Sequence, residues 1–379
     1  MLIPDHSSKK QEKFRNPTRE AKLHHQGMNG IMPLGCGSCP DKEICGGLSI
    51  SQPFFDCLSD YCCNSPGDCD VVCLNNPKDY AERFLEVGSF DFENVPRACK
   101  IDTKELPDIV PVIYNGSSRV DKFSSSTVAL VLYSVIPNMA GRKRFETRES
   151  LVDKFKLSDN SSIVLTGTKE DVLLENWWSI GEPKRKEAIR NLCELGIELV
   201  TTPNYSLFTD LPRWDDLHSM KRIAITHSEF LNGGISAALH INARTNYDYE
   251  RWSNYLISRS EITHISFEFT TGAGKGDRSK WHLDMLKQLS ATVGRRLKLI
   301  VRGASLSVLF ELGRYFEVTA LDTTVFMKTA KRKLGHLYDD DLVAWTHTET
   351  FKGEPIDELL EQNWNTIKEL HRNSLSRRS

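Results

Sequence analysis

The sequence predicts an α/β protein, and a (β/α) barrel is the arrangement that fits it best. Eight short runs after residue 105 are apolar and rich in β-branched residues, as strands buried on both faces should be. Helical periodicity separates the later runs, and from residue 184 onward helix and strand alternate without a break. Such alternation demands a parallel sheet covered by helices, and eight strands favour a closed or partly closed barrel over an open doubly wound sheet.

The predicted elements follow in order along the chain. Strands are predicted at 109–114, 128–135, 163–166, 197–202, 235–241, 262–269, 297–301 and 317–321. Helices are predicted at 184–195, 213–231, 247–259, 278–293 and 305–312, and Gly196 and Gly294 stand where helices commonly end. No helix is predicted between the first two strands, so the first half should depart from strict eightfold repetition.

The chain divides into four parts by composition. Residues 1–30 form a basic flexible arm, 31–104 a cysteine-rich module, 105–335 the barrel, and 336–379 an acidic loop, an amphipathic helix and a basic tail. The loop contains Asp339, Asp340 and Asp341, for which solvated carboxylates are a simpler interpretation than a cation site. The helix is predicted from apolar residues at spacings of three and four: Ile356, Leu359, Leu360, Trp364, Ile367 and Leu370.

Composition and charge narrow the function classes. Hydrophobic residues make up 39% of the 379 residues, as in soluble globular proteins. The longest apolar run, 128–136, is too short to cross a bilayer, and the first residues lack the apolar region of a secretory signal. We therefore expect a cytoplasmic protein without a membrane partner. The formal net charge of −2 argues against overall attraction to nucleic acid, although basic residues gather at both ends.

Eight of the ten cysteines lie within residues 36–73, among Gly, Pro, Asp and Ser. They are Cys36, Cys39, Cys45, Cys57, Cys62, Cys63, Cys69 and Cys73. Thiolates this dense require either disulfides or a metal, and a cytosolic chain keeps its thiols reduced. The segment is therefore predicted to be a metal-binding module.

An iron–sulfur cluster is favoured over zinc as the cofactor. Zinc sites usually have two well-separated CxxC pairs or a histidine ligand, whereas here only Cys36 and Cys39 form a CxxC pair. Iron–sulfur clusters tolerate uneven spacing and often have a proline beside a ligand, as Pro40 stands beside Cys39. Cys36, Cys39 and Cys45 are the expected core ligands, and Cys57 and Cys63 are the members most simply explained as non-ligands. Outside the module, Cys193 is expected to be a buried thiol in a helix.

Polar residues follow the predicted strands, at the end of a parallel barrel where chemistry usually occurs. Turns would favour Gly, Pro and Ser, but these positions hold Arg, His, Glu and Asp. Glu268, Asp322 and His240 are the predicted catalytic residues, because an inward carboxyl group near a strand end would be desolvated and its pKa raised. The predicted substrate-binding residues here are Arg244, Asn242, Arg302, Tyr114 and Tyr205.

Each of these residues also has a structural interpretation. Arg302 or Asp322 could cap a helix, and a lone strand histidine such as His240 is more often a hydrogen-bonded structural residue. The set as a whole favours an active or binding site, because polar residues of these types follow six consecutive predicted strands.

A glycine-rich segment follows the strand that ends near Glu268. It contains Thr271, Gly272, Gly274 and Lys275 but does not match the Walker A pattern. Backbone N–H groups at a helix N-terminus can still bind phosphate, and barrels often bind phosphate in their later loops. These four residues are therefore added to the predicted substrate site, with a flexible loop as the alternative.

Four segments, 203–222, 240–244, 267–272 and 322–328, resemble an uncharacterised family of barrel-like α/β proteins. Its members carry a domain of unknown function and are common in bacteria, phages and mobile elements. The resemblance covers roughly residues 105–330. It implies a barrel-like fold but no activity that could be transferred to this chain.

Two function classes are compatible with these features. The first is a metal-cluster barrel enzyme acting on a nucleotide, a modified base or nucleic acid. Radical chemistry with S-adenosylmethionine is a disfavoured subtype, because the common CxxxCxxC spacing is absent. The second is a non-catalytic nucleic-acid recognition protein whose metal module is a structural staple. The position of the module relative to the strand ends would distinguish the two.

Overall fold

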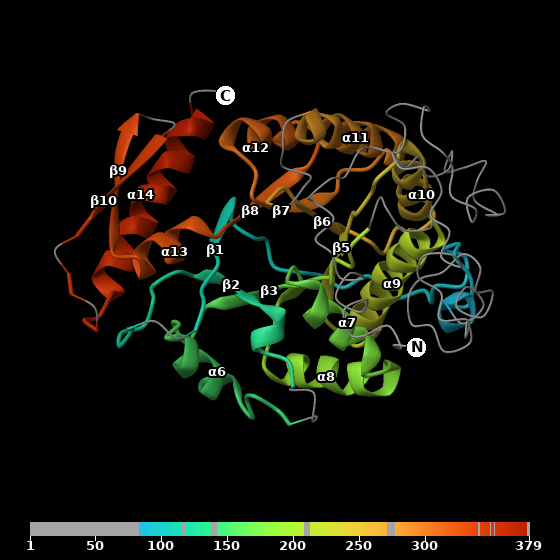
Figure 1. Cartoon of the computed structure of the whole chain (residues 1–379), viewed down its shortest axis with the longest axis horizontal. Helices are drawn as coiled ribbons and strands as arrows, with labels where there is room; N and C mark the ends of the chain where they lie inside the picture. Colours follow the sequence, from blue (N-terminus) through green and yellow to red (C-terminus); the bar gives the residue numbers. More distant parts are fainter. Residues whose placement is uncertain are drawn as a thin grey trace, which may run out of the picture.

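The structure is a computed structural model, and the residues it describes are 83–115, 118–137, 142–207, 213–270, 277–339, 342–348, 350–351 and 353–376. Eight strands form one parallel sheet in the order β1-β8-β7-β6-β5-β4-β3-β2. A bridge between Val112 and Ala129 joins β1 to β2, and the Ile113 N–H donates to the Ala129 carbonyl at 2.8 Å. The sheet is therefore a nearly closed barrel, as the sequence predicts (Figure 1).

All eight predicted strands are confirmed in type and order. The barrel strands are β1 (Ile109–Pro111), β2 (Thr127–Val131), β3 (Ser162–Thr166), β4 (Leu199–Thr201), β5 (Ser236–His240), β6 (His264–Glu268), β7 (Lys298–Arg302) and β8 (Glu317–Asp322). Every one of these strands is apolar at its centre and is covered by helices, as a parallel sheet requires.

The five predicted helices are also present, as α8 (Glu182–Glu194), α9 (Arg213–Asn232), α10 (Asn246–Ile257), α11 (Asp277–Val293) and α12 (Leu306–Gly313). Gly196 and Gly294 adopt positive φ just after α8 and α11, which an L-residue with a side chain resists. The first half adds helices that the sequence did not specify: α6 (Arg148–Phe155), α7 (Asp171–Ser179) and the 3-10 turn η2 (Leu132–Ser134).

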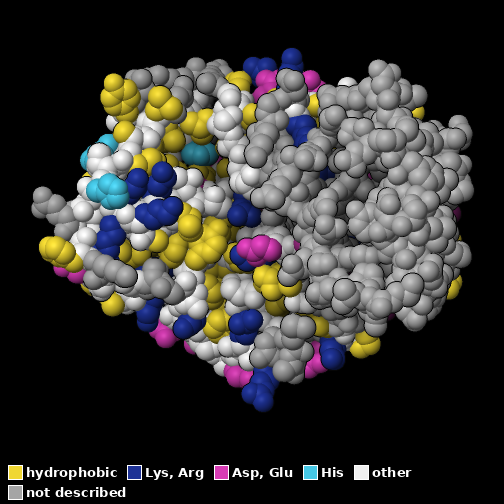
Figure 2. All heavy atoms as spheres, in the orientation of Figure 1, with side chains coloured by type: hydrophobic (Ala, Val, Ile, Leu, Met, Phe, Trp, Pro, Cys, Tyr) yellow, Lys and Arg dark blue, Asp and Glu magenta, His cyan; other side chains and the backbone are white. Residues whose placement is uncertain are grey.

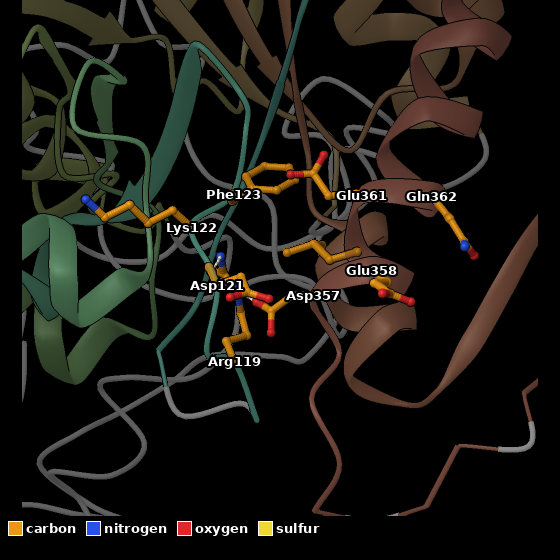
Figure 3. Close-up of a pocket in the computed structure, with 9 residues that line it drawn as sticks. Arg119, Asp121, Lys122, Phe123, Asp357, Glu358, Glu361 and Gln362 are labelled. Atoms are coloured by element: carbon orange, nitrogen blue, oxygen red, sulfur yellow. Dashed lines mark hydrogen bonds and ion pairs between the residues drawn. The ribbon is translucent and has the colours of Figure 1, made fainter.

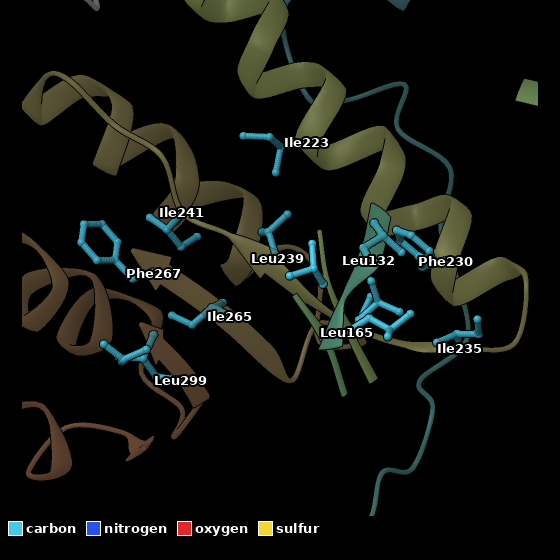
Figure 4. Close-up of a cluster of buried hydrophobic side chains, with 14 of the residues drawn as sticks. Leu132, Leu165, Ile223, Phe230, Ile235, Leu239, Ile241, Ile265, Phe267 and Leu299 are labelled. Carbon is cyan, nitrogen blue, oxygen red and sulfur yellow. The ribbon is translucent and has the colours of Figure 1, made fainter. Parts of the chain in front are cut away.

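Alternation along the strands separates two apolar cores. The interior core is small and consists of Val110, Val112, Ala129, Val164, Leu199, Ala238, Ile300 and Leu321. The outer faces of the strands meet the helices in a larger core, which includes Leu239 beside α9 and Ile265 and Leu299 on the next strands (Figure 4). Side chains alternate between the two faces of a strand, so residues an even number of positions from Ala238 or Ile300 on the same strand also point into the barrel. We call these residues, and those paired with them in register, residues of interior parity.

The C-terminal helix lies beside the one strand connection that has no helix of its own. α14 (Asp357–Ser376) contacts β1, and Trp364 packs near Phe123 in the β1–β2 connection. Arg119 forms an ion pair of 3.2 Å with Asp357, and both line a cavity of about 340 Å³ at the start of α14 (Figure 3). We interpret this cavity as a gap in the packing of α14 against the β1–β2 connection, because the Arg119–Asp357 ion pair links these two segments.

A β-hairpin precedes α14 where the sequence suggested a loop. β9 (Lys333–Asp339) and β10 (Leu342–His347) pair antiparallel after α13 (Thr324–Ala330). Tyr338 and Leu342 of the hairpin are exposed, and Lys, Arg and His side chains lie beside hydrophobic ones on this part of the surface (Figure 2). The pattern was missed because residues 333–338 do not alternate cleanly between polar and apolar.

Residues 83–108 run down the side of the barrel before β1. Glu86 contacts α9 near its start through His218, and Ser228, near the end of α9, donates to the Pro96 carbonyl. Thr103 then reaches Ser236 at the beginning of β5. Residue 83 therefore lies toward the C-terminal ends of the strands, and residue 103 lies at their N-terminal ends.

Three further findings concern the sequence predictions. Cys193 is exposed, although its Sγ contacts the Gly233 carbonyl, so the prediction of a buried thiol is wrong. The basic arm, the eight clustered cysteines and the Thr271–Lys275 segment lie outside the described residues. Within the described part of the chain, the helices are too short or too polar to span a bilayer.

Candidate functional site

Several polar side chains point into the barrel at the C-terminal ends of the strands, which we call the mouth. Thr201 is paired in register with Ala238, His240 with Ser266, and Glu268 with Arg302. Because paired residues of neighbouring parallel strands share a face, all of these have interior parity. The mouth is therefore polar, whereas the centre of the barrel is apolar.

Glu268 and Arg302 form the centre of the mouth. A guanidinium nitrogen of Arg302 lies 3.3 Å from Glu268 Oε2. The other carboxylate oxygen accepts from the Thr270 N–H at 3.0 Å and from the Thr270 hydroxyl. The Glu268 side chain is only 2% exposed, whereas that of Arg302 is 21% exposed. The cation is thus the member of the pair that a ligand could reach first.

Burial raises the pKa of Glu268 above its usual value, while Arg302 and hydrogen bonds from Thr270 and Thr168 oppose this shift. The net direction shows that desolvation outweighs the neighbouring cation. A raised pKa makes a carboxyl group a better proton donor and acceptor in catalysis than an ordinary surface carboxylate.

The close approach of β6 and β7 at the mouth depends on Gly303. Its φ is +77°, and a Cβ there would lie 2.1 Å from Thr270 Cγ2 and 2.7 Å from Thr270 N. Thr270 can therefore fold over the end of β7 and donate to Glu268 only because residue 303 has no side chain.

His240 lies inside the barrel beside Ser266, with Nδ1 3.3 Å from the Ser266 hydroxyl. Burial lowers the pKa of His240 to about 3, so its imidazole is neutral at physiological pH. It can donate or accept a hydrogen bond at the mouth, but it does not supply positive charge there.

Arg244 and Asn242 follow β5 and turn away toward the surrounding helices. Arg244 Nε donates to the Leu207 carbonyl at 3.0 Å, and its own N–H donates to Asp248 at the start of α10. Burial, with a contribution from Arg278, lowers the pKa of Arg244 to about 10. Asn242 donates to Asn204 and to the Tyr205 carbonyl. Both side chains hold loops together at the edge of the mouth.

The two predicted stacking residues differ in accessibility. Tyr205 is fully buried, and the Arg222 guanidinium lies 4.2 Å from its ring centre. It has no free face for a ligand ring. Tyr114 is half-buried at the end of β1, 5.6 Å from the Phe326 ring, and stays compatible with a role in binding.

Asp322 serves as a helix cap. Its Oδ1 accepts from the N–H groups of Thr324 and Val325, at 3.0 and 2.8 Å, at the start of α13. It pairs in register with Pro111, whereas its neighbour Leu321 has interior parity. The structure thus brings Glu268 and Arg302 together and places Asp322 and Arg244 in other contacts.

A buried charged layer outside the barrel was not foreseen from the sequence. Arg222 makes a two-bond contact with Glu175, and Arg185 makes one with Glu229, so α7, α8 and α9 are joined. Arg185 also lies 4.3 Å from the Trp178 ring. Such partners lie far apart along the chain, and no local pattern could have paired them. The layer fixes α7, α8 and α9 to one another.

The same layer fastens the segment that enters from the cysteine-rich region. Glu86 accepts from Trp178 Nε1 at 2.7 Å and lies 2.7 Å from His218 Nε2. Further along, the buried Lys221 amine donates to the Asp91 carbonyl and to Asn94. Burial lowers the pKa of Lys221 to about 8, although Asp91 opposes this shift.

The described residues contain no group of three or more His, Cys, Asp or Glu side chains that could hold a metal ion. A metal site in this part of the chain is therefore not indicated, and the predicted ligands all lie in residues 36–73. Comparison of the sequence with protein-family models and with curated proteins found no match.

Proposed function

We propose that this protein is an enzyme whose active site is the barrel mouth and whose substrate is a nucleotide, a modified base or nucleic acid. The observation that carries the proposal is the Glu268–Arg302 pair, in which a buried carboxyl group of raised pKa contacts a partly exposed guanidinium. Glu268 is assigned the role of general acid or base, and Arg302 that of binding an anionic group of the substrate.

The pair suggests how binding and proton transfer are linked. An anionic substrate group competes with Glu268 for Arg302, because the guanidinium can form two parallel bonds with one phosphate. When Arg302 turns to the substrate, Glu268 loses its nearest positive charge while it stays buried. Its pKa then rises further, and the carboxyl group holds a proton that it can donate to the bound substrate.

The predicted metal cluster belongs to the same proposal. Iron–sulfur is favoured over zinc, with Cys36, Cys39 and Cys45 and one downstream cysteine as ligands. Arg83, where the described chain begins, comes ten positions after Cys73, and Glu86 is held by Trp178 and His218.

Titration calorimetry against nucleotides and short oligonucleotides tests the substrate class. Arg302→Lys should weaken binding roughly 10- to 100-fold, the effect of losing one charged hydrogen bond. Glu268→Gln keeps the shape of the mouth but cannot ionise, so it should bind and should not show the pH dependence of the wild-type protein. Lys154→Met, which changes an exposed lysine of α6, is the matched control. Absence of binding by the wild-type protein to all of these ligands would discard the substrate class.

Metal analysis and the visible spectrum of anaerobically purified protein test the cofactor. Broad visible absorption with iron and sulfide supports the iron–sulfur cluster. Stoichiometric zinc in a colourless protein rejects it, and a folded protein without metal rejects the module itself.

One observation favours the alternative, a non-catalytic nucleic-acid recognition protein. The β9–β10 hairpin carries exposed Tyr338 and His347, and exposed Lys331 and Phe351 lie close to it in the sequence. Such a combination of cations and rings suits phosphate and base contacts. Oligonucleotide binding that is lost in Lys331→Glu but kept in Arg302→Lys would support this alternative against the enzyme.

A further inference from the structure

A cavity lies at the opposite end of the barrel from the mouth. Its volume is about 730 Å³, within the range of small-molecule sites. It is bounded by the N-terminal ends of β7 and β8, by α12 and by the end of α14 (Figure 1). The segment before β1 contributes Glu105, Leu106 and Asp108.

One wall of this cavity is apolar. Leu306, Leu309 and Phe310 of α12 line it together with Phe316 and Val318. The α12 side chains are only half-buried, although this helix is the most apolar of those around the barrel. The helix therefore presents hydrophobic side chains to the cavity beyond those that the barrel core covers.

The polar wall carries two basic side chains on adjacent strands. His264 begins β6 and Lys298 begins β7, and the two are paired in register, so they point to the same side. His264 is 3% exposed, and its Nε2 has no hydrogen-bond partner among the described residues. Lys298 is half-buried and forms no ion pair within the described part of the chain.

Glu317 of β8 is paired in register with Lys298, but no ion pair joins the two, and two neighbouring bases cannot satisfy each other. Burial lowers the pKa of His264 to about 4, and the nearby Lys298 adds to that shift. Buried polar atoms in folded proteins nearly always have a partner, so an unpartnered Nε2 facing a cavity calls for a ligand or water. The group that would complement both side chains is a carboxylate.

The charges around the entrance limit the ligand further. Glu105, Asp108 and Glu317 line the cavity and are exposed, which places three carboxylates near any bound molecule. A dianionic phosphate would be repelled more strongly than a monoanion. Arg314 and Arg296 are already engaged, by Glu311 and by the carbonyls of Gly313 and Phe316.

We propose that this cavity binds an apolar monocarboxylate, with its carboxylate between Lys298 and His264 and its apolar body against Leu306, Leu309 and Phe310 of α12. The site is independent of the mouth, since its residues come from the other ends of the same strands. A ligand bound in this cavity would contact α12 and α14, the two helices that enclose it, and would strengthen their packing.

Calorimetry and thermal unfolding of the full-length protein test this site with octanoate and 2-naphthoate. Octanol, octylamine and octyl phosphate serve as neutral, cationic and dianionic controls. At least one carboxylate should bind and raise the melting temperature, while the three controls should bind at least 10-fold more weakly. Binding of neither carboxylate tighter than about 1 mM would overturn the proposal.

Two variants locate the site and guard against a folding defect. Lys298→Met should weaken carboxylate binding by roughly 10- to 100-fold, as expected for losing one charged hydrogen bond. Leu309→Trp should abolish it by filling the cavity, and both variants should unfold near the wild-type temperature. Lys154→Met, on α6 and away from the cavity lining, is the control and should bind normally. Equal binding of octanol and octanoate, or unchanged affinity in both cavity variants, would overturn the assignment.

Discussion

The two ends of β6 and β7 differ in how their paired polar side chains are bonded. At the mouth, Glu268 and Arg302 face each other, and the carboxylate also receives the Thr270 N–H. At the other end, His264 and Lys298 are paired in register, and Glu317 of β8 stands opposite Lys298 without forming an ion pair with it. Both pairs are in register on the same two strands, so the backbone treats them alike. The two side chains at the mouth bond to each other, whereas His264 Nε2 has no hydrogen-bond partner among the described residues.

Breaking each pair should therefore have very different consequences for stability. Arg302→Met leaves the Glu268 carboxylate buried without its cation, which should lower the free energy of unfolding by about 3 kcal/mol. Lys298→Met leaves no buried acid behind and should change it by less than about 0.5 kcal/mol. Urea unfolding of both variants at neutral pH measures the contrast.

The double variant Glu268→Gln with Arg302→Met is the control for this contrast. Removing both charges should recover most of the loss, because the remaining amide can be satisfied by Thr270. Equal losses in Arg302→Met and Lys298→Met would show that the two ends are energetically alike and would break the comparison.

The alternation along β6 was the part of the site that sequence could predict. Residues 262–269 alternate so that His264, Ser266 and Glu268 fall on one face of a strand, and the register with β5 and β7 confirms this. Arg302 follows the next predicted strand, and parallel order brings the ends of neighbouring strands together, which is where the structure has Arg302 beside Glu268. Both steps rest on local periodicity and on the parallel order of strands, which short-range patterns determine.

Other features depend on packing between distant segments and could not be predicted in the same way. Tyr205 is covered by Arg222 because α9 folds over the β4 loop. Asp322 turns away from the mouth because α13 begins two residues later and offers unpaired N–H groups. The cavity beside His264 exists only because α12 and α14 pack some distance apart at the N-terminal end, which no strand pattern encodes.

Acid should destabilise both ends of the barrel. Burial lowers the pKa of His240 at the mouth to about 3 and that of His264, with help from Lys298, to about 4. In the unfolded chain both imidazoles titrate near their ordinary pKa of about 6.5. The unfolded state therefore binds more protons below that value, and the free energy of unfolding should fall by about 1.4 kcal/mol per pH unit for each histidine between about pH 6 and pH 4.

Urea unfolding as a function of pH measures this loss, and the two ends can be separated. His264→Gln and His240→Gln should each reduce the slope by about one proton. Saturating octanoate should reduce the contribution of His264 alone, because a bound carboxylate favours the protonated imidazole. A slope that is the same in wild type and in both variants would show that neither histidine is buried in its neutral form.

The smallest expected effect concerns Asp322, a half-buried carboxyl group at the end of β8. Asp322→Ala removes the acceptor for the Thr324 and Val325 N–H groups, which should cost about 1 kcal/mol, the usual effect of losing a helix cap. Asp322→Asn keeps an acceptor oxygen and should cost less.

Because Asp322 faces α13 and Glu268 faces Arg302, neither change should alter nucleotide binding at the mouth, whereas Glu268→Gln should alter its pH dependence. Calorimetric titration of the three variants beside their unfolding curves separates the two roles. A loss of binding in Asp322→Asn at unchanged stability would place Asp322 in the site and extend the mouth to β8.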